Sequence, residues 1–69
     1  MREDDFKFYQ RLLYERAGLA LGHDKTYLLL TRLSPLSKSL GYETLDDFTA
    51  QVRKTLAPND LSMIVEAMT

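Results

Sequence analysis

The sequence holds few residues that could carry out covalent chemistry. It contains no cysteine and one histidine, His23, so a serine or cysteine nucleophile with a histidine base would depend on that residue alone. His23 stands in the turn that leads into a helical pattern, where a capping or surface role is expected. We therefore predict that this 69-residue chain is not catalytic by itself.

The acidic residues gather where helices are predicted to begin. The clustered ones are Glu3, Asp4, Asp5, Asp46 and Asp47. The positive end of a helix dipole attracts carboxylates to such positions, which makes a paired acid–base site the less favoured interpretation. A calcium loop would need oxygen ligands at regular offsets around a glycine, whereas the glycines here stand singly at predicted helix ends. No metal site is therefore predicted.

Three basic residues in the central segment are the candidates for binding: Lys25, Arg32 and Lys38. Lys25 and Arg32 are seven residues apart, so an α-helix places both at the edge of its apolar stripe. Such residues most often form a solvated face. Basic side chains beside an apolar seam also suit an acidic helical partner, and residue type alone leaves both interpretations open.

The segment that must position them runs from Asp24 to Gly41. Its apolar stripe consists of Leu29, Leu33, Leu36 and Leu40. These leucines recur at steps of four, three and four, as expected for one face of an α-helix. Pro35 either kinks this helix or ends it, with Ser34 capping a second short helix. We favour one kinked helix because the leucine register continues across the proline.

Hydrophobic periodicity predicts three further helices. With the central one, they span about residues 4–17, 24–40, 45–56 and 60–68. Gly18 and Gly41 are expected to end the first two helices in the left-handed conformation. The expected N-caps are Asp24 (or His23, one residue earlier), Thr44, and Asn59 or Asp60. Because no segment alternates with a period of two, the predicted fold is all-α, a small up-down-like four-helix bundle with its central helix kinked at Pro35.

The remaining apolar residues define the predicted core. Besides the central leucines, the inward stripes are Phe6, Tyr9, Leu13 and Ala17; Leu45, Phe48, Val52 and Leu56; and Leu61, Ile64, Val65 and Met68. Leu19 and Leu21 in the first linker are expected to plug into the same core. Tyr14 is also expected to be mostly core, whereas Phe8 lies off the main stripe and is either exposed or packed against another partner.

Composition limits the kinds of partner. The formal net charge is −1 and the pI about 5.7, so no basic field exists to hold a nucleic-acid backbone. The longest apolar run, Leu28–Leu30, is too short to cross a membrane, and the acidic N-terminus does not suit a signal peptide. We therefore predict a cytoplasmic domain without membrane insertion. The last helix runs almost to Thr69, which suggests a piece cut from a longer protein.

Several short motifs follow one another in a specific order. They are Phe6, the run Tyr14–Leu21 (YERAGLAL), Lys25, the pair Arg32-Leu33, the pair Leu40-Gly41, Phe48, and the closing Glu66–Thr69 (EAMT). Their order and spacing resemble the N-terminal helical domain of the chemotaxis receptor methyltransferases, the CheR-type enzymes. The resemblance covers essentially the whole chain.

This resemblance implies a function. CheR-type enzymes transfer a methyl group from S-adenosylmethionine to glutamate side chains on the cytoplasmic helices of chemoreceptors, using a C-terminal α/β domain. Their small helical domain packs over the cofactor cleft, and its second helix carries basic residues that meet the receptor. By position, Arg32 and Lys38 would face the substrate, and Lys25 opens the same helix.

Two departures from the family pattern bear on this expectation. Family members commonly carry a run of arginines where this chain has Ser34, Pro35, Leu36 and Ser37. The family's cofactor-contacting "TNeT-FFR" segment would follow Thr69, so we expect no appreciable binding of S-adenosylmethionine by these residues alone. The alternative is a stand-alone helical module that binds a partner protein. A helix-turn-helix DNA-binding domain is disfavoured by the net charge and the proline in the second helix.

Overall fold

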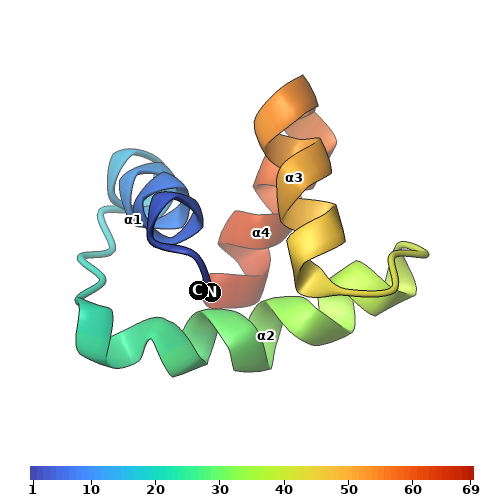
Figure 1. Cartoon of the computed structure of the whole chain (residues 1–69). Helices are drawn as coiled ribbons and strands as arrows, with labels where there is room; N and C mark the ends of the chain where they lie inside the picture. The colour runs from blue at the N-terminus through green and yellow to red at the C-terminus, as the bar shows by residue number, and fades with distance from the viewer.

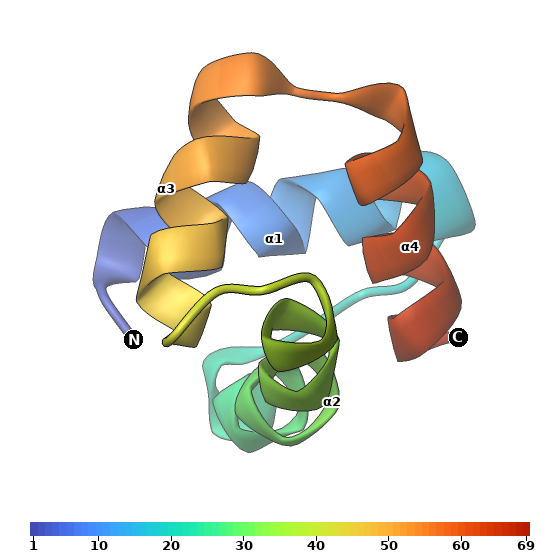
Figure 2. The same cartoon turned by 90° about the vertical axis from the view of Figure 1, so that its right-hand side faces the viewer.

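The computed structural model describes all 69 residues and contains four α-helices, one short 3₁₀ turn and no strand. The elements are α1 (Glu3–Ala17), η1 (His23–Lys25), α2 (Thr26–Ser39), α3 (Leu45–Thr55) and α4 (Pro58–Met68). The predicted all-α, four-helix fold is confirmed. Helix α2 lies across the base, where α3 and α4 pack on it, and α3 and α4 run in opposite directions (Figures 1 and 2).

The predicted glycine stops are confirmed. Gly18 has φ +65° and Gly41 has φ +93°, both in the left-handed region that favours glycine. At the end of α2 the Gly41 N–H donates to the Lys38 carbonyl, and the Tyr42 N–H donates to the Ser37 carbonyl, each at 3.0 Å. These two bonds satisfy carbonyls that the helix would otherwise leave unpaired.

One predicted N-cap is confirmed and one is wrong. The Thr44 hydroxyl accepts a hydrogen bond from the Asp47 N–H at 3.1 Å and so caps α3. Asp24 does not cap α2, because it lies inside the 3₁₀ turn and makes no side-chain cap bond. The Thr26 hydroxyl instead donates to the His23 carbonyl at 2.8 Å, and α2 begins at Thr26.

The predicted junction between the last two helices is also wrong in detail. Neither Asn59 nor Asp60 caps α4, which begins at Pro58. Proline suits the first helical position, since its φ is already helical and its missing N–H would have been unpaired. Helix α3 ends at Thr55, and Leu56 adopts φ +52°, the one non-glycine residue in the left-handed region.

Helix α2 runs through Pro35 as one α-helix, which confirms the continuous helix over the two-helix alternative. The kink itself stays a prediction. Ser37, two residues after Pro35, is fully buried, and its hydroxyl donates to the Ser34 carbonyl at 2.8 Å. This local bond satisfies a buried polar group beside the proline.

The core contains twelve buried apolar residues. They are Phe6, Tyr9, Leu13, Leu21, Leu29, Leu33, Leu45, Phe48, Val52, Leu61, Ile64 and Met68. Leu21 is buried in this core, which confirms that the linker contributes to it. Leu19 and Leu36 are half-buried and pack against the core. The expectation for Phe8 was wrong, because it is half-buried and packs on the core of the chain itself.

Four residues predicted for the core lie outside it. Leu40 is 38% exposed because α2 has already ended before it, and Leu56 is 53% exposed because its left-handed backbone turns the side chain off the stripe. Tyr14 is 65% exposed on the outer side of α1, and Ala17 in the last turn of α1 is exposed.

Side-chain contacts fasten α3 to α1. The Tyr9 hydroxyl and Thr49 Oγ1 are 2.6 Å apart, and both residues are buried. Arg53 Nη1 donates to Asp5 Oδ1 at 2.7 Å and also lies 3.2 Å from Asp4 Oδ2. From the sequence, these acids were expected only to compensate the helix dipole, and the structure shows that they also join an α1–α3 ion-pair cluster.

Candidate functional site

The three predicted binding residues all lie at the surface. Arg32 and Lys38 are exposed on α2, and Lys25 is exposed in η1, directly before the helix begins. None of them forms an ion pair within the chain. Their charges are therefore free for an external anion.

The structure places these residues at three different points along α2. Lys25 is the last residue of η1 and has φ −106° and ψ 14°, so the α-helical spacing expected between it and Arg32 does not hold through Lys25. Lys38 lies six residues after Arg32 in α2, which rotates it by about 120° around the helix. The three residues therefore do not form one continuous basic face, and Lys25 and Arg32 stand at the two ends of the first two turns of α2.

Several other cations of the chain are already neutralised by internal partners. Arg53 is held by Asp5 and Asp4, and hydrogen bonds to these two carboxylates raise the pKa of its guanidinium. Arg11 pairs with Glu15 at 2.7 Å along α1. Lys25 and Arg32 have no such partner, which separates them from these paired cations.

Apolar side chains are exposed along another side of α2. Tyr27 is 56% exposed and Leu30 is 42% exposed. They are three residues apart, so they are neighbours on the helix surface. Helix α2 therefore presents to its surroundings both a basic pair and an apolar pair of residues.

His23 occupies a surface contact between α1 and η1. Its Nε2 lies 2.8 Å from Glu3 Oε2, and its ring packs on Phe6 with centroids 4.3 Å apart. Both polar side chains are more than half exposed. The geometry fits the predicted capping or surface role, and no nucleophilic side chain is hydrogen-bonded to the imidazole.

The carboxylates do not assemble a metal or acid–base centre. The structure gathers no group of three or more histidine, cysteine, aspartate or glutamate side chains in ligand geometry. Asp4 has a lowered pKa, chiefly because it accepts a hydrogen bond from Arg53, so it is ionised at neutral pH and unsuited to act as a general acid.

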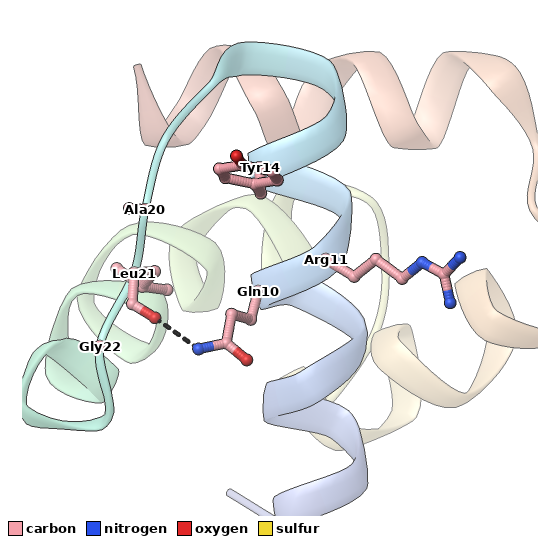
Figure 3. Close-up of a pocket in the computed structure, with 6 residues that line it drawn as sticks. All are labelled: Gln10, Arg11, Tyr14, Ala20, Leu21 and Gly22. Carbon is pink, nitrogen blue, oxygen red and sulfur yellow. Dashed lines mark hydrogen bonds between the residues drawn. The ribbon is translucent and has the colours of Figure 1, made fainter.

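Sequence reasoning missed a pocket of about 500 Å³ between α1 and the linker that follows it. It is lined by Gln10, Arg11, Tyr14, Ala20, Leu21 and Gly22 (Figure 3). Gln10 Nε2 donates to the Leu21 carbonyl at 2.8 Å and so holds the linker beside α1. The small residues of the linker were the one available signal, because they leave space next to the helix.

A family model described as "CheR methyltransferase, all-alpha domain" matches residues 4–69. No curated protein and no solved structure matches the chain. No helix is both long and apolar enough to cross a membrane.

Proposed function

This chain belongs to the CheR methyltransferase all-alpha domain family, and from that premise we propose that it recognises the protein substrate of a chemotaxis methyltransferase. The substrates would be glutamate side chains on the cytoplasmic helices of chemoreceptors. S-adenosylmethionine would supply the methyl group, within a C-terminal catalytic domain outside these residues. The domain would act in the cytoplasm as a recognition and closing element.

The residues of this chain do not fit that cofactor. Its glycines stand singly at the ends of helices and 3₁₀ turns, so no glycine-rich loop is available to approach the cofactor backbone closely. The pocket beside α1 is lined by amide, aromatic, aliphatic and one basic side chain, with no carboxylate to hold ribose hydroxyls. We therefore assign no step of methyl transfer to these residues.

One observation carries the proposal: Lys25 and Arg32 are exposed at the two ends of the first two turns of α2 and have no internal partner. An acidic helix laid along α2 would gain charge-assisted contacts to both residues. At a solvated rim such contacts chiefly raise the association rate and fix the register, and each adds only modest affinity. Lys38 projects in another direction and would contribute less to the same helix.

The test is a titration of the isotope-labelled chain with a peptide spanning one methylation helix of a chemoreceptor, followed by amide NMR shifts. We expect the shifts to cluster over the first two turns of α2, from Lys25 to Arg32. Lys25→Gln and Arg32→Gln should each weaken binding about twofold to fivefold. Raising salt from about 50 mM to about 300 mM should weaken the wild-type complex and should affect the variants less.

Lys7→Gln is the matched control, because Lys7 is an exposed, unpaired lysine on α1. It should leave the affinity unchanged. If Lys7→Gln weakened peptide binding as much as the α2 variants do, the loss would be explained by the overall charge of the chain. No shifts at millimolar peptide would contradict receptor docking on α2 and would favour a lid or scaffold role for the domain.

A further inference from the structure

An apolar groove lies between α1 and the end of α3, on a surface that receptor docking on α2 does not use. Its volume is about 280 Å³, and it is lined by Phe8, Arg11, Leu12, Glu15 and Leu56. Phe8 and Leu12 stand one turn apart on α1, and both are half-buried against the core. Leu56 is 53% exposed. The groove therefore offers three apolar side chains to an occupant, beside one cation and one anion.

The residue type at Leu56 is not explained by the fold. Its backbone has φ +52° and ψ +38°, a left-handed conformation that glycine adopts at the lowest cost. A glycine would end α3 as Gly18 ends α1, and the exposed leucine side chain gains little burial in return for the strain. Strained positions of this kind concentrate at binding sites. An exposed leucine held at the edge of an apolar groove therefore indicates a docking surface.

The two charged residues of the groove are paired with each other but keep polar atoms free. Arg11 Nε donates to Glu15 Oε1 at 2.7 Å, and both side chains are more than half exposed. The other two nitrogens of the Arg11 guanidinium and Glu15 Oε2 form no hydrogen bond or ion pair within the chain. Figure 3 shows that Arg11 points away from the linker pocket. The pair can therefore bind an occupant without breaking its internal bond.

We propose that the occupant is a second copy of this chain, in a weak twofold dimer with the two α1 helices antiparallel. In such a dimer the same surface serves both copies, and each contact occurs twice. The antiparallel arrangement sets Arg11 of each copy opposite Glu15 of the other, so that four charges alternate in sign. The exposed Leu56 side chains supply the apolar groups that fill the two grooves.

The charges of the groove select this occupant. A strongly acidic partner would be repelled by Glu15, and a strongly basic partner would be repelled by Arg11. A second copy brings both signs in the reverse order, together with an exposed leucine. Exposed ion pairs chiefly fix the register of a contact, so the apolar groups supply most of the affinity. A contact centred on one groove is smaller than the about 1,200 Å² that stable interfaces bury, and we expect a Kd of about 0.1–1 mM.

The first test is dilution of the isotope-labelled chain from about 2 mM to about 0.05 mM, followed by amide NMR shifts and translational diffusion. We expect concentration-dependent shifts at Phe8, Leu12 and Leu56, with faster diffusion on dilution. Leu56→Gly should weaken the dimer at least about fivefold, although it relieves backbone strain in the single chain. Leu40→Gly removes another exposed leucine just after a helix, and as the matched control it should leave the dimer unchanged.

The second test mixes two charge-reversed variants. Arg11→Glu would set two acids against each other at both ends of the contact, and Glu15→Arg would set two cations against each other, so each variant alone should dimerise less than the wild type. An equimolar mixture should recover dimerisation, because each end of the contact again joins opposite charges. Neither variant keeps the internal pair, so the recovery would have to come from contacts between copies.

A charge-matched mixture separates this contact from general attraction. Lys38→Glu on α2 and Glu66→Arg on α4 give the same two net charges on exposed positions outside the groove, and their mixture should gain nothing over the wild type. A chain that stays monomeric at about 2 mM would overturn the proposal. Equal weakening by Leu40→Gly, or equal recovery in both mixtures, would also overturn it. None of these measurements involves Lys25 or Arg32, so failure of the dimer and failure of receptor docking are seen separately.

Discussion

Tyr9 donates its phenolic hydrogen to Thr49 Oγ1 across the interface between α1 and α3, over 2.6 Å. The direction follows from the second bond of Thr49, whose single hydroxyl hydrogen is donated to the Leu45 carbonyl at 2.8 Å. Thr49 Oγ1 can therefore only accept from Tyr9. The two helices are joined by a buried, directional chain of hydrogen bonds that ends on the backbone of α3.

Removing the Tyr9 hydroxyl and removing the Thr49 hydroxyl should lower stability by different amounts. Thr49→Val leaves the buried Tyr9 hydroxyl without an acceptor, and we expect it to lower the free energy of unfolding by about 1–3 kcal/mol. Tyr9→Phe leaves Thr49 still bonded to Leu45, so its cost should be smaller, about 0.5–1.5 kcal/mol. Urea unfolding of both single variants and the double variant measures this, and equal single costs would contradict the assigned direction.

Burial of the same hydroxyl predicts a loss of stability at high pH. Burial raises the pKa of Tyr9 from 10.0 to about 12, and the negative charges of Asp5 and Asp46 act in the same direction. The contribution is complete below pH 10, where the unfolded tyrosine keeps its proton, and it is lost as pH rises toward about 12. The total loss should be about 2–3 kcal/mol.

Thermal unfolding of the wild type and Tyr9→Phe between these two pH values tests this effect. The variant should show a shallower decline, because it lacks the ionising group. Tyr14→Phe is the control, since Tyr14 is mostly exposed and should leave the decline unchanged. A decline as steep in Tyr9→Phe as in the wild type would contradict the prediction.

Acid should weaken the cluster of Arg53 with Asp4 and Asp5. The hydrogen bond from Arg53 holds the pKa of Asp4 below its usual 3.8. Its stabilising contribution is therefore present above that value and is lost as pH falls through the lower pKa of the folded state. Asp4→Asn should be less stable than the wild type at about pH 6, and the two should converge at about pH 2. A constant difference across this range would show that the charge of Asp4 is irrelevant.

Removing Arg53 should cost more than removing Asp4. Arg53→Met keeps the aliphatic stem but leaves the Asp5 carboxylate, which is only 7% exposed, without its cation. We expect a larger drop in the free energy of unfolding than for Asp4→Asn, measured in urea at neutral pH. Lys54→Met is the matched control, because Lys54 is exposed on the same helix and forms no ion pair. A similar loss in both variants would mean that the ion pairs add nothing.

The fold was largely readable from local patterns. Periodicity placed Leu29 and Leu33 in the core, and Gly18 and Gly41 ended their helices as expected. The pattern failed at Leu40, where the leucine spacing continues but the helix has stopped. Periodicity assumes that the helix continues, and the stop depends on the closing bonds around Gly41, which compete with one more helical residue.

Leu33 and Leu40 therefore offer a direct test of where the stripe ends. Leu33 is fully buried, and Leu33→Ala should lower the free energy of unfolding by about 2–5 kcal/mol. Leu40 is 38% exposed, and Leu40→Ala should cost less than about 1 kcal/mol. Melting curves of the two variants measure these losses of stability. A comparable loss in both would mean that Leu40 contributes to the core after all.

The candidate sites were harder to predict from the sequence than the fold, because they depend on contacts between distant parts of the chain. Nothing in the sequence near Arg53 indicated that Asp4 and Asp5 would neutralise it, so it looked as free as Arg32. Likewise, the linker is held beside α1 by the bond between Gln10 and Leu21, which are eleven residues apart. Residue type identified Lys25 and Arg32 as candidates, and only the tertiary structure distinguished them from the paired cations.

Leu56 carries backbone strain that a single substitution should relieve. It sits at φ +52° and ψ +38°, a conformation that costs a non-glycine residue about 1–2 kcal/mol. Its side chain is 53% exposed, so burial offsets little of that cost. Leu56→Gly should therefore raise the free energy of unfolding by about 0.5–1 kcal/mol, or the melting temperature by about 2–8 °C.

Leu40→Gly is the matched control for this substitution. Leu40 is also an exposed leucine just after a helix, but its φ is −90°, which any residue adopts without strain. Glycine there gains nothing in the folded state and adds freedom to the unfolded chain, so it should lower stability by about 0.5–1 kcal/mol. Opposite signs at the two positions would identify the left-handed backbone as the cause. A loss at both would mean that the contacts of Leu56 with Phe8 and Leu12, which line the same groove, outweigh its strain.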